Sequence, residues 1–169
     1  MTGDPTFWKD RYNDGQWKGG VRRVKKVIAA LQEKGLDATP YADDALSEEY
    51  IKATSHERGE PDVKIAFKDR IVLLEVTGPD INIPATSGLW FRPDKLEYAE
   101  NHPELEVWGA HIIEGPPALI RFIQFTPGMN KKYPTVRPTI RGTTETFKEI
   151  PANDTNILTL QQFCDQVHR

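Results

Sequence analysis

The stretch GEPDVKIAFKDRIVLLEVTGP, residues 59–79, places two acidic side chains in and beside apolar segments. Asp62 begins residues 62–67, in which polar and apolar residues alternate, and Glu75 lies inside the aliphatic run 71–77. Alternation predicts a half-buried strand, and a continuous run of β-branched and aliphatic residues predicts a central strand. A buried, unpaired carboxylate is costly, so Glu75 requires either a proton or a cation.

The loop between these two strands decides which side chains share a face of the hairpin. If the loop is Lys68-Asp69, Asp62 lies directly opposite Glu75. If the loop is one residue later, Lys64 takes that place and Asp62 faces Thr77. A three-residue loop would put the two acids on opposite faces, because side chains alternate with a period of two. Cross-strand Cβ atoms on one face lie about 5 Å apart, so two carboxylates on that face can share a Mg²⁺ ion, whose ligand distances are roughly 2.1 Å.

The rest of the chain predicts a mixed sheet flanked by helices. Apolar positions 21, 24, 28 and 31 have helical spacing, and Gly35 suits a C-cap. Pro93 suits the first turn of a second helix that ends before Pro103. Thr159 and Gln162 have the spacing of a capping box at the start of a third helix. Strands are expected at 105–113 and 119–125, with Pro127-Gly128 closing the sheet, and a short helix is expected within 47–59. The prolines of residues 130–156 argue against regular structure there or for an edge excursion.

Composition limits the class of protein. The 169 residues fit one domain, 1–169, and no apolar run approaches the length of a membrane span. The N-terminal sequence lacks a secretory signal pattern, so we expect a cytoplasmic protein. One cysteine, Cys164, excludes an internal disulfide, and the four histidines lack zinc-ligand spacing. A net charge of −3 argues against coating nucleic acid by bulk charge, although a local basic face remains open.

The pair Pro61-Asp62 and, thirteen positions beyond Asp62, the run Glu75-Val76-Thr77 resemble the motif of the PD-(D/E)xK nuclease superfamily, which includes restriction endonucleases and archaeal Holliday-junction resolvases. The resemblance spans about residues 17–125 and implies an α/β fold with an αβββαβ core, followed by a C-terminal tail and helix over 126–169. It further implies that Asp62, Glu75 and the backbone carbonyl of Val76 bind Mg²⁺ or Mn²⁺. The expected activity is that of a hydrolase, a magnesium-dependent deoxyribonuclease or endonuclease, and a homodimer is compatible with the family.

The sequence departs from this motif at position 77, where Thr replaces the lysine that orients the attacking water in the family. Thr77 can donate a hydrogen bond but carries no positive charge. Two lysines can substitute: Lys64, on the same strand face as Asp62, and Lys95, at the start of the following helix. We favour Lys95, because the long loop 78–92 can bring that helix over the end of the hairpin.

Basic residues supply candidate contacts to DNA phosphates. These are Arg22, Arg23, Lys25 and Lys26 on the first helix and Lys131 and Lys132 in the tail. Such contacts would position a duplex without reading its sequence. The opening helix has no acid before Glu33, whereas many relatives offer a glutamate to the metal there, so one metal ion is the simpler expectation. The alternatives are a catalytically inactive nuclease-fold module that binds nucleic acid or acts as a scaffold, and an unrelated fold in which Asp62, Lys64 and Glu75 form a structural ion network.

Overall fold

A computed structural model describes residues 16–41, 60–140 and 142–168. The short helix expected within 47–59 lies outside these residues. The helices are α2 (Gln16–Glu33), α4 (Pro93–Asn101), α5 (Met129–Lys132) and α6 (Leu160–Val167). The strands are β1 (Asp37–Pro40), β2 (Val63–Ala66), β3 (Ile71–Thr77), β4 (Leu89–Phe91), β5 (Glu106–Ile113), β6 (Leu119–Gln124), β7 (Thr135–Val136), β8 (Thr139–Ile140), β9 (Thr143–Thr144), β10 (Phe147–Ile150) and β11 (Leu158–Thr159).

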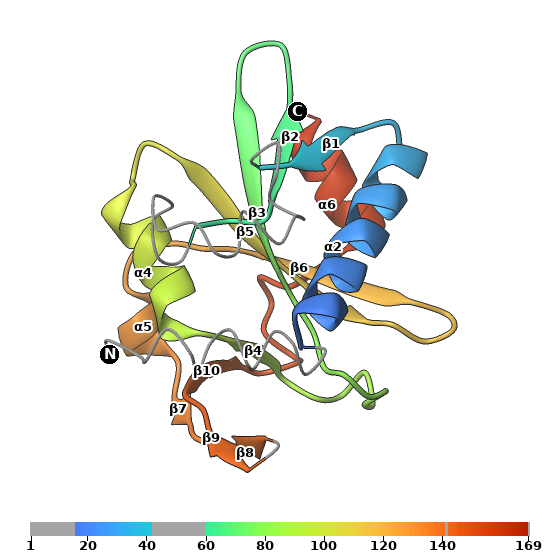
Figure 1. Ribbon diagram of the computed structural model, residues 1–169. Coiled ribbons are helices and arrows are strands. Elements are labelled where there is room, and N and C mark those ends of the chain that lie inside the picture. Colours follow the sequence, from blue (N-terminus) through green and yellow to red (C-terminus); the bar gives the residue numbers. More distant parts are fainter. Residues whose placement is uncertain (1–15, 42–59, 141, 169) are drawn as a thin grey trace.

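The main sheet has six strands in the order β1-β2-β3-β5-β6-β11 (Figure 1). Strand β3 pairs antiparallel with β2 and parallel with β5, and the other neighbouring pairs are antiparallel. The predicted mixed α/β sheet is therefore confirmed. The crossover between the parallel strands β3 and β5 carries the loop 78–88, β4 and α4, as parallel strands require a long connection.

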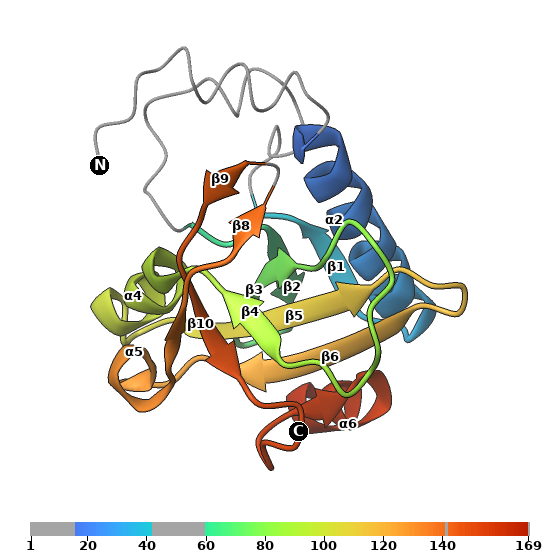
Figure 2. The same cartoon turned by 90° about the horizontal axis from the view of Figure 1, so that it is seen from below.

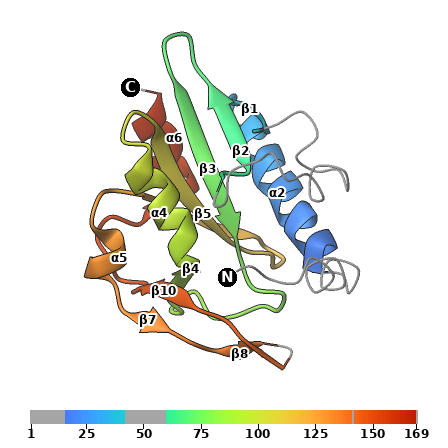
Figure 3. The same ribbon diagram turned by 60° about the vertical axis from the view of Figure 1, so that its left-hand side comes forward.

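Alternating side chains divide the core into two layers on opposite faces of the sheet. Figure 3 shows α2 and α4 on these opposite sides. On one face, Val72 and Leu74 of β3 pack with apolar residues of α2 and α6. On the other face, Leu73 packs with residues of β4, α4, α5 and β10, including Leu96 of α4. Glu75 follows Leu73 by two residues and so belongs to the second face, beneath α4.

A smaller sheet of β4, β10 and β7 covers part of this second face (Figure 2). Strand β10 pairs antiparallel with β4, which leads directly into α4. The aromatic rings of Phe91 and Phe125 meet edge to face, with centroids 5.1 Å apart. The C-terminal part of the chain thereby packs against the element that carries Lys95.

The sequence predictions differ from the structure in several elements. The first helix is longer than 21–31, and Gly35 has the positive φ of 84° expected after a helix C-terminus. The capping box at Thr159 is present. Strands β1 and β4 were not predicted from the sequence. The prediction of irregular structure for residues 130–156 is wrong, since this segment forms α5 and four short strands, and Pro127-Gly128 does not close the sheet, since β11 pairs with β6.

No helix in the described ranges is long and apolar enough to cross a membrane.

Substitution of Gly109 tests the close packing of the second face. A Cβ atom at this position of β5 would lie 2.5 Å from Phe91 Cζ and 2.7 Å from Phe125 Cε1. Because both rings are held in the core, we expect Gly109→Ala to lower the free energy of unfolding by about 1–3 kcal/mol, measured by urea denaturation. The control is Gly20→Ala in α2, where a Cβ has no neighbour within 4 Å; it should be neutral or stabilising by up to about 1 kcal/mol. Equal effects of both substitutions would contradict this packing.

Candidate active site

The hairpin of β2 and β3 has the two-residue loop that brings Asp62 and Glu75 together. Phe67 N donates to Arg70 O at 2.9 Å across the loop Lys68-Asp69, and Val63 pairs with Leu74. Continuing this register by one residue places Asp62 opposite Glu75, on the same side of the sheet.

The backbone of β3 holds the Asp62 carboxylate. Val76 N donates to Asp62 Oδ2 at 2.9 Å, and Asp62 N donates to Leu74 O at 2.8 Å. Because the N–H and C=O groups of one strand residue point to the same side, the carbonyl of Val76 also points toward Asp62 rather than toward β5. The backbone thus presents a third oxygen beside the two carboxylates.

Lys95 reaches this pair from α4. Its Nζ atom lies 3.3 Å from Glu75 Oε2, with the Lys95 side chain 22% exposed and that of Glu75 8% exposed. The contact is an ion pair, but Glu75 Oε2 has no hydrogen-bond partner of good geometry among the described residues. The nineteen residues between Glu75 and Lys95 include the loop 78–88 and β4, which turn the chain back over the sheet.

Burial raises the pKa of both carboxyl groups, and like charge raises it further at Glu75. Burial raises the pKa of Asp62, and the charge of Lys95 and the hydrogen bond from Val76 oppose this. Burial and the charge of Asp62 raise the pKa of Glu75 well above its usual range. Burial opposes the charge on Lys95, but Glu75 and Asp62 outweigh it and raise the pKa of the ammonium, so Lys95 stays positive. When both acids are ionised, they carry one more negative charge than the single ammonium of Lys95 neutralises.

The residues present are compatible with a divalent cation. Among the described residues, no three His, Cys, Asp or Glu side chains gather into a metal-binding group, so the donors are the carboxylates of Asp62 and Glu75 and the carbonyl of Val76. All three are oxygen donors, which Mg²⁺ and Mn²⁺ prefer, and water commonly completes such a shell. The unsatisfied Glu75 Oε2 atom gives a cation a further partner to bind.

Lys64 and Thr77, the other two candidate residues, lie on the same face of the sheet as Glu75 but do not take part in its ion pair. Lys64 pairs with Leu73, and its ammonium forms no ion pair with any residue that the structure describes. Thr77 lies two residues beyond Glu75 at the end of β3, half-buried. The geometry therefore brings Lys95, and not Lys64, to the acidic pair.

Two buried polar residues on the same face were not predicted as part of the site. His111 of β5 is the neighbour of Thr77, and Arg121 of β6 is the neighbour of His111. Arg121 Nη1 donates to Ala85 O at 3.0 Å and to Ser87 O at 2.8 Å, so it holds the loop that follows β3. The only sequence signal was an arginine inside an apolar strand.

His111 is neutral in this setting. Burial, reinforced by the charges of Arg121 and Arg23, lowers the pKa of His111 to about 3. Because a guanidinium can only donate, the contact of 3.3 Å between Arg121 Nη2 and His111 Nδ1 requires Nδ1 to be the acceptor, with the proton on Nε2.

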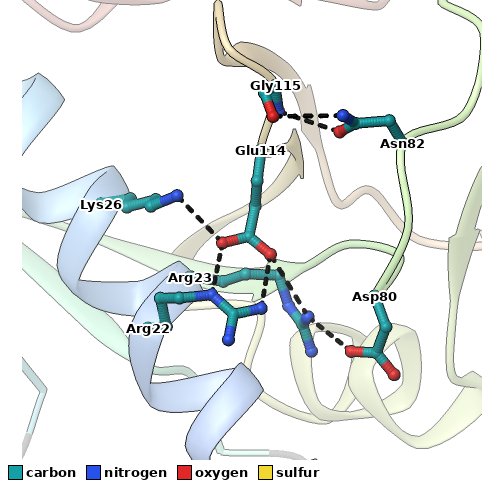
Figure 4. Close-up of polar contacts among 7 residues, drawn as sticks. All are labelled: Arg22, Arg23, Lys26, Asp80, Asn82, Glu114 and Gly115. Atoms are coloured by element: carbon teal, nitrogen blue, oxygen red, sulfur yellow. Dashed lines mark hydrogen bonds and ion pairs between the residues drawn. The ribbon is translucent and has the colours of Figure 1, made fainter.

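The basic residues of α2 are engaged with acids at the ends of β3 and β5 (Figure 4). Arg22 donates to both oxygens of Glu114, at 2.6 and 2.7 Å, and Lys26 Nζ lies 3.1 Å from Glu114 Oε1. Arg23 Nη1 lies 3.0 Å from Asp80 Oδ1 and 3.9 Å from Glu114 Oε2. These three cations outnumber the two acids, and the side chains of Arg22 and Lys26 remain about half exposed.

The remaining predicted phosphate contacts lie on exposed surface. Lys25 is an exposed residue of α2. Lys131 and Lys132 end α5, and Lys132 Nζ lies 5.1 Å from the centre of the Tyr133 ring. The structure therefore separates the predicted contacts into a group on α2 and a group on α5.

These elements define a fold class. The six-stranded mixed sheet, with helices on both faces, has a resolvase-like fold. The structure is similar to that of Hjc of Archaeoglobus fulgidus, described as a Holliday junction resolvase from an archaeal hyperthermophile. The TM-score is 0.50, with 16% sequence identity over 87% of this chain and 96% of that chain. No family model matches the sequence, and no curated protein matches it. The likeness thus concerns the fold.

The Glu114 network should make stability depend on pH. The hydrogen bond from Arg22 is the main cause that lowers the pKa of Glu114 from 4.5 to about 2. A depressed carboxylate pKa stabilises the folded state above pH 4.5, and this contribution disappears as the pH falls from about 4.5 to 2. We expect Glu114→Gln to lower the free energy of unfolding by about 1–2 kcal/mol at pH 7, allowing for solvent at the exposed cations, and to have little effect near pH 2.

The measurement is urea denaturation of both proteins across this range. Comparing them at each pH removes the contribution of other titrating groups, including His111, because both proteins share them. A constant difference at all pH values would mean that the carboxylate charge of Glu114 is not the source.

Proposed function

We propose that this protein is a metal-dependent phosphodiesterase that hydrolyses DNA. The observation that carries the proposal is the meeting of Asp62, Glu75 and Lys95 on one face of a sheet with a resolvase-like fold. Lys95 comes from a different element than the motif lysine of the PD-(D/E)xK family, yet its ammonium lies 3.3 Å from Glu75. An acidic pair beside a permanently charged lysine is the set of groups that this reaction needs.

Each residue has a role that follows from its chemistry. Asp62, Glu75 and the Val76 carbonyl would hold Mg²⁺ or Mn²⁺, which, when bound, polarises phosphoryl oxygens and makes water a better nucleophile. Lys95 holds the attacking water in place and offsets the charge that develops on the phosphate. Thr77 can donate a hydrogen bond to the same phosphate from the end of β3.

The basic residues of α2 and α5 are the proposed contacts to the DNA backbone. Arg22 and Lys26 are half exposed and belong to a cluster with more cations than acids. Phosphates can therefore compete with Glu114 for their donors. Lys25, Lys131 and Lys132 extend these contacts along the duplex, and contacts of this kind give binding that weakens with salt.

Two observations favour a second function, that of a nucleic-acid-binding module without catalysis. Thr77 replaces the motif lysine, and α2 carries no acid in its first turn that could complete a metal site. A protein of this kind would bind DNA in a salt-dependent manner and would not cleave it.

Cleavage assays separate the two functions. With Mg²⁺ or Mn²⁺, we expect hydrolysis of at least one substrate among linear duplex, single-stranded and branched DNA. Asp62→Ala and Glu75→Ala should abolish it, and Lys95→Met should lower kcat by about 10²- to 10³-fold, because the lysine stabilises charge in the transition state.

The matched control for Lys95 is Lys64→Met, which removes a lysine from the same face of the sheet but not from the ion pair. It should cleave at close to the wild-type rate. Loss of activity in Lys64→Met but not in Lys95→Met would reverse the assignment. Salt-dependent binding with no turnover by the wild-type protein would instead support the binding module, and loss of stability alone in the acidic variants would indicate a structural ion network.

Metal binding can be measured apart from cleavage. Mn²⁺ should raise the melting temperature of the wild-type protein, with a stabilisation of about 2.7 kcal/mol at a hundred times the dissociation constant. Since the raised pKa of Glu75 lets a proton compete with the ion, the shift should grow as the pH increases. Glu75→Gln should remove the shift, whereas Glu97→Gln, at an exposed position of α4, should retain it. An unchanged shift in Glu75→Gln would place the ion elsewhere.

A further inference from the structure

Lys95 lies in a part of α4 where a lysine does not help the helix. It is the third residue of α4, and the N-terminus of a helix carries a partial positive charge that disfavours cations. Its aliphatic stem is also flexible and must be held for the ammonium to stay at Glu75. The position of the first turn of α4 therefore decides where the ammonium lies.

That first turn begins at Arg92. Arg92 is the N-cap residue of α4, although its side chain does not cap the helix, and its carbonyl accepts a hydrogen bond from Lys95 N at 3.0 Å. Pro93 follows with its restricted φ, so the backbone from Arg92 to Lys95 has little freedom. A displacement of Arg92 would move Lys95 with it.

The C-terminal segment holds Arg92 through a carboxylate. Arg92 Nη2 lies 2.5 Å from Glu145 Oε1, and the Glu145 side chain is 7% exposed. The Arg92 guanidinium also lies 5.3 Å from the centre of the Phe147 ring, which stacks on Trp90 with centroids 5.5 Å apart. These contacts join the end of β4 to the segment that leads into β10.

A second contact fixes the next residue of α4. Asn130 Nδ2, from α5, donates to Pro93 O at 3.2 Å. The start of α4 is thus held by Glu145 before β10 and by Asn130 in α5, both from the C-terminal third of the chain. Figure 1 shows α4 leaving the end of β4 beside α5.

We propose that the Arg92–Glu145 ion pair is a positioning device that holds the first turn of α4 so that Lys95 meets Glu75. The inference rests on the proposed function for its catalytic consequence, but the placement of Lys95 can be measured without cleavage. The contacts given above join Arg92 to Glu145 and to the backbone of Lys95, so their effect on the site passes through Lys95.

The experiment measures the acetylation rate of Lys95 in the native protein by site-resolved mass spectrometry, with kcat and KM measured in parallel. In the wild-type protein, acetylation of Lys95 should be slow, because its ammonium lies against Glu75 and its side chain is largely covered. Glu145→Ala should raise this rate several-fold and lower kcat by about 10- to 100-fold with little change in KM, as expected when a catalytic group is displaced by a small distance. Glu145→Gln, which keeps an oxygen to accept from Arg92, should restore most of both values.

The matched control is Glu149→Ala in β10. Glu149 Oε2 accepts from Trp90 Nε1 at 3.2 Å, so this variant loses a contact between the same two strands without touching Arg92. It should lower stability and leave the acetylation of Lys95 near the wild-type rate.

Unchanged acetylation of Lys95 in Glu145→Ala, or an equal increase in Glu149→Ala, would overturn the positioning role. Failure of the proposed function has a different signature, since a wild-type protein that cleaves no substrate would still show the acetylation pattern if Glu145 positions Lys95.

Discussion

The arrangement of this protein depends on a charge imbalance buried beside the centre of the main sheet. Asp62 and Glu75 present two carboxylates, and Lys95 supplies one ammonium, in surroundings where unpaired charge is costly. A structural role alone would be better served by apolar residues of similar volume, because a buried ion pair contributes little net stability. When both carboxyl groups are ionised, they carry one more negative charge than Lys95 neutralises, which suits them to binding a cation.

Three parts of the chain cooperate to produce this imbalance. The tight hairpin puts Asp62 opposite Glu75, and the crossover between the parallel strands β3 and β5 returns α4 to the same face. Arg121 fastens the first half of the crossover by donating to two of its carbonyl groups, and the C-terminal segment fastens the second half through Arg92. Arg121 thus holds the C-terminal end of the loop 78–88, and the contacts of Asp80 with Arg23 and of Asn82 with Gly115 hold its first part.

The sequence predicted the local parts of this arrangement better than its long-range parts. The strands 71–77 and 105–113, the helix at Pro93 and the capping box at Thr159 each depend on neighbouring residues, and their periods or end signals are visible in the sequence. The strands β4 and β11, with three and two residues, are too short to show a period, and they form by pairing with distant strands.

The same distinction applies to the candidate site. The sequence limited the position of Asp62 relative to Glu75 to a few alternatives, one for each possible hairpin loop, because strand pairing is regular. The length of the loop 78–92 was the only sequence evidence that Lys95 could reach the acidic pair. The distance between its ammonium and Glu75 depends on how β10 and α5 pack against the start of α4. The engagement of Arg22 and Lys26 by Glu114 could not be foreseen, because it joins residues about ninety positions apart.

The two borders of the main sheet have a consequence for the behaviour of the protein in concentrated solution. Strand β1 has four residues and ends in Pro40, which lacks an amide proton, and β11 has two residues followed at once by α6. Short borders of this kind offer few free backbone groups to an incoming strand of another molecule. These two borders of the sheet are consequently poorly suited to growth by addition of strands from another molecule.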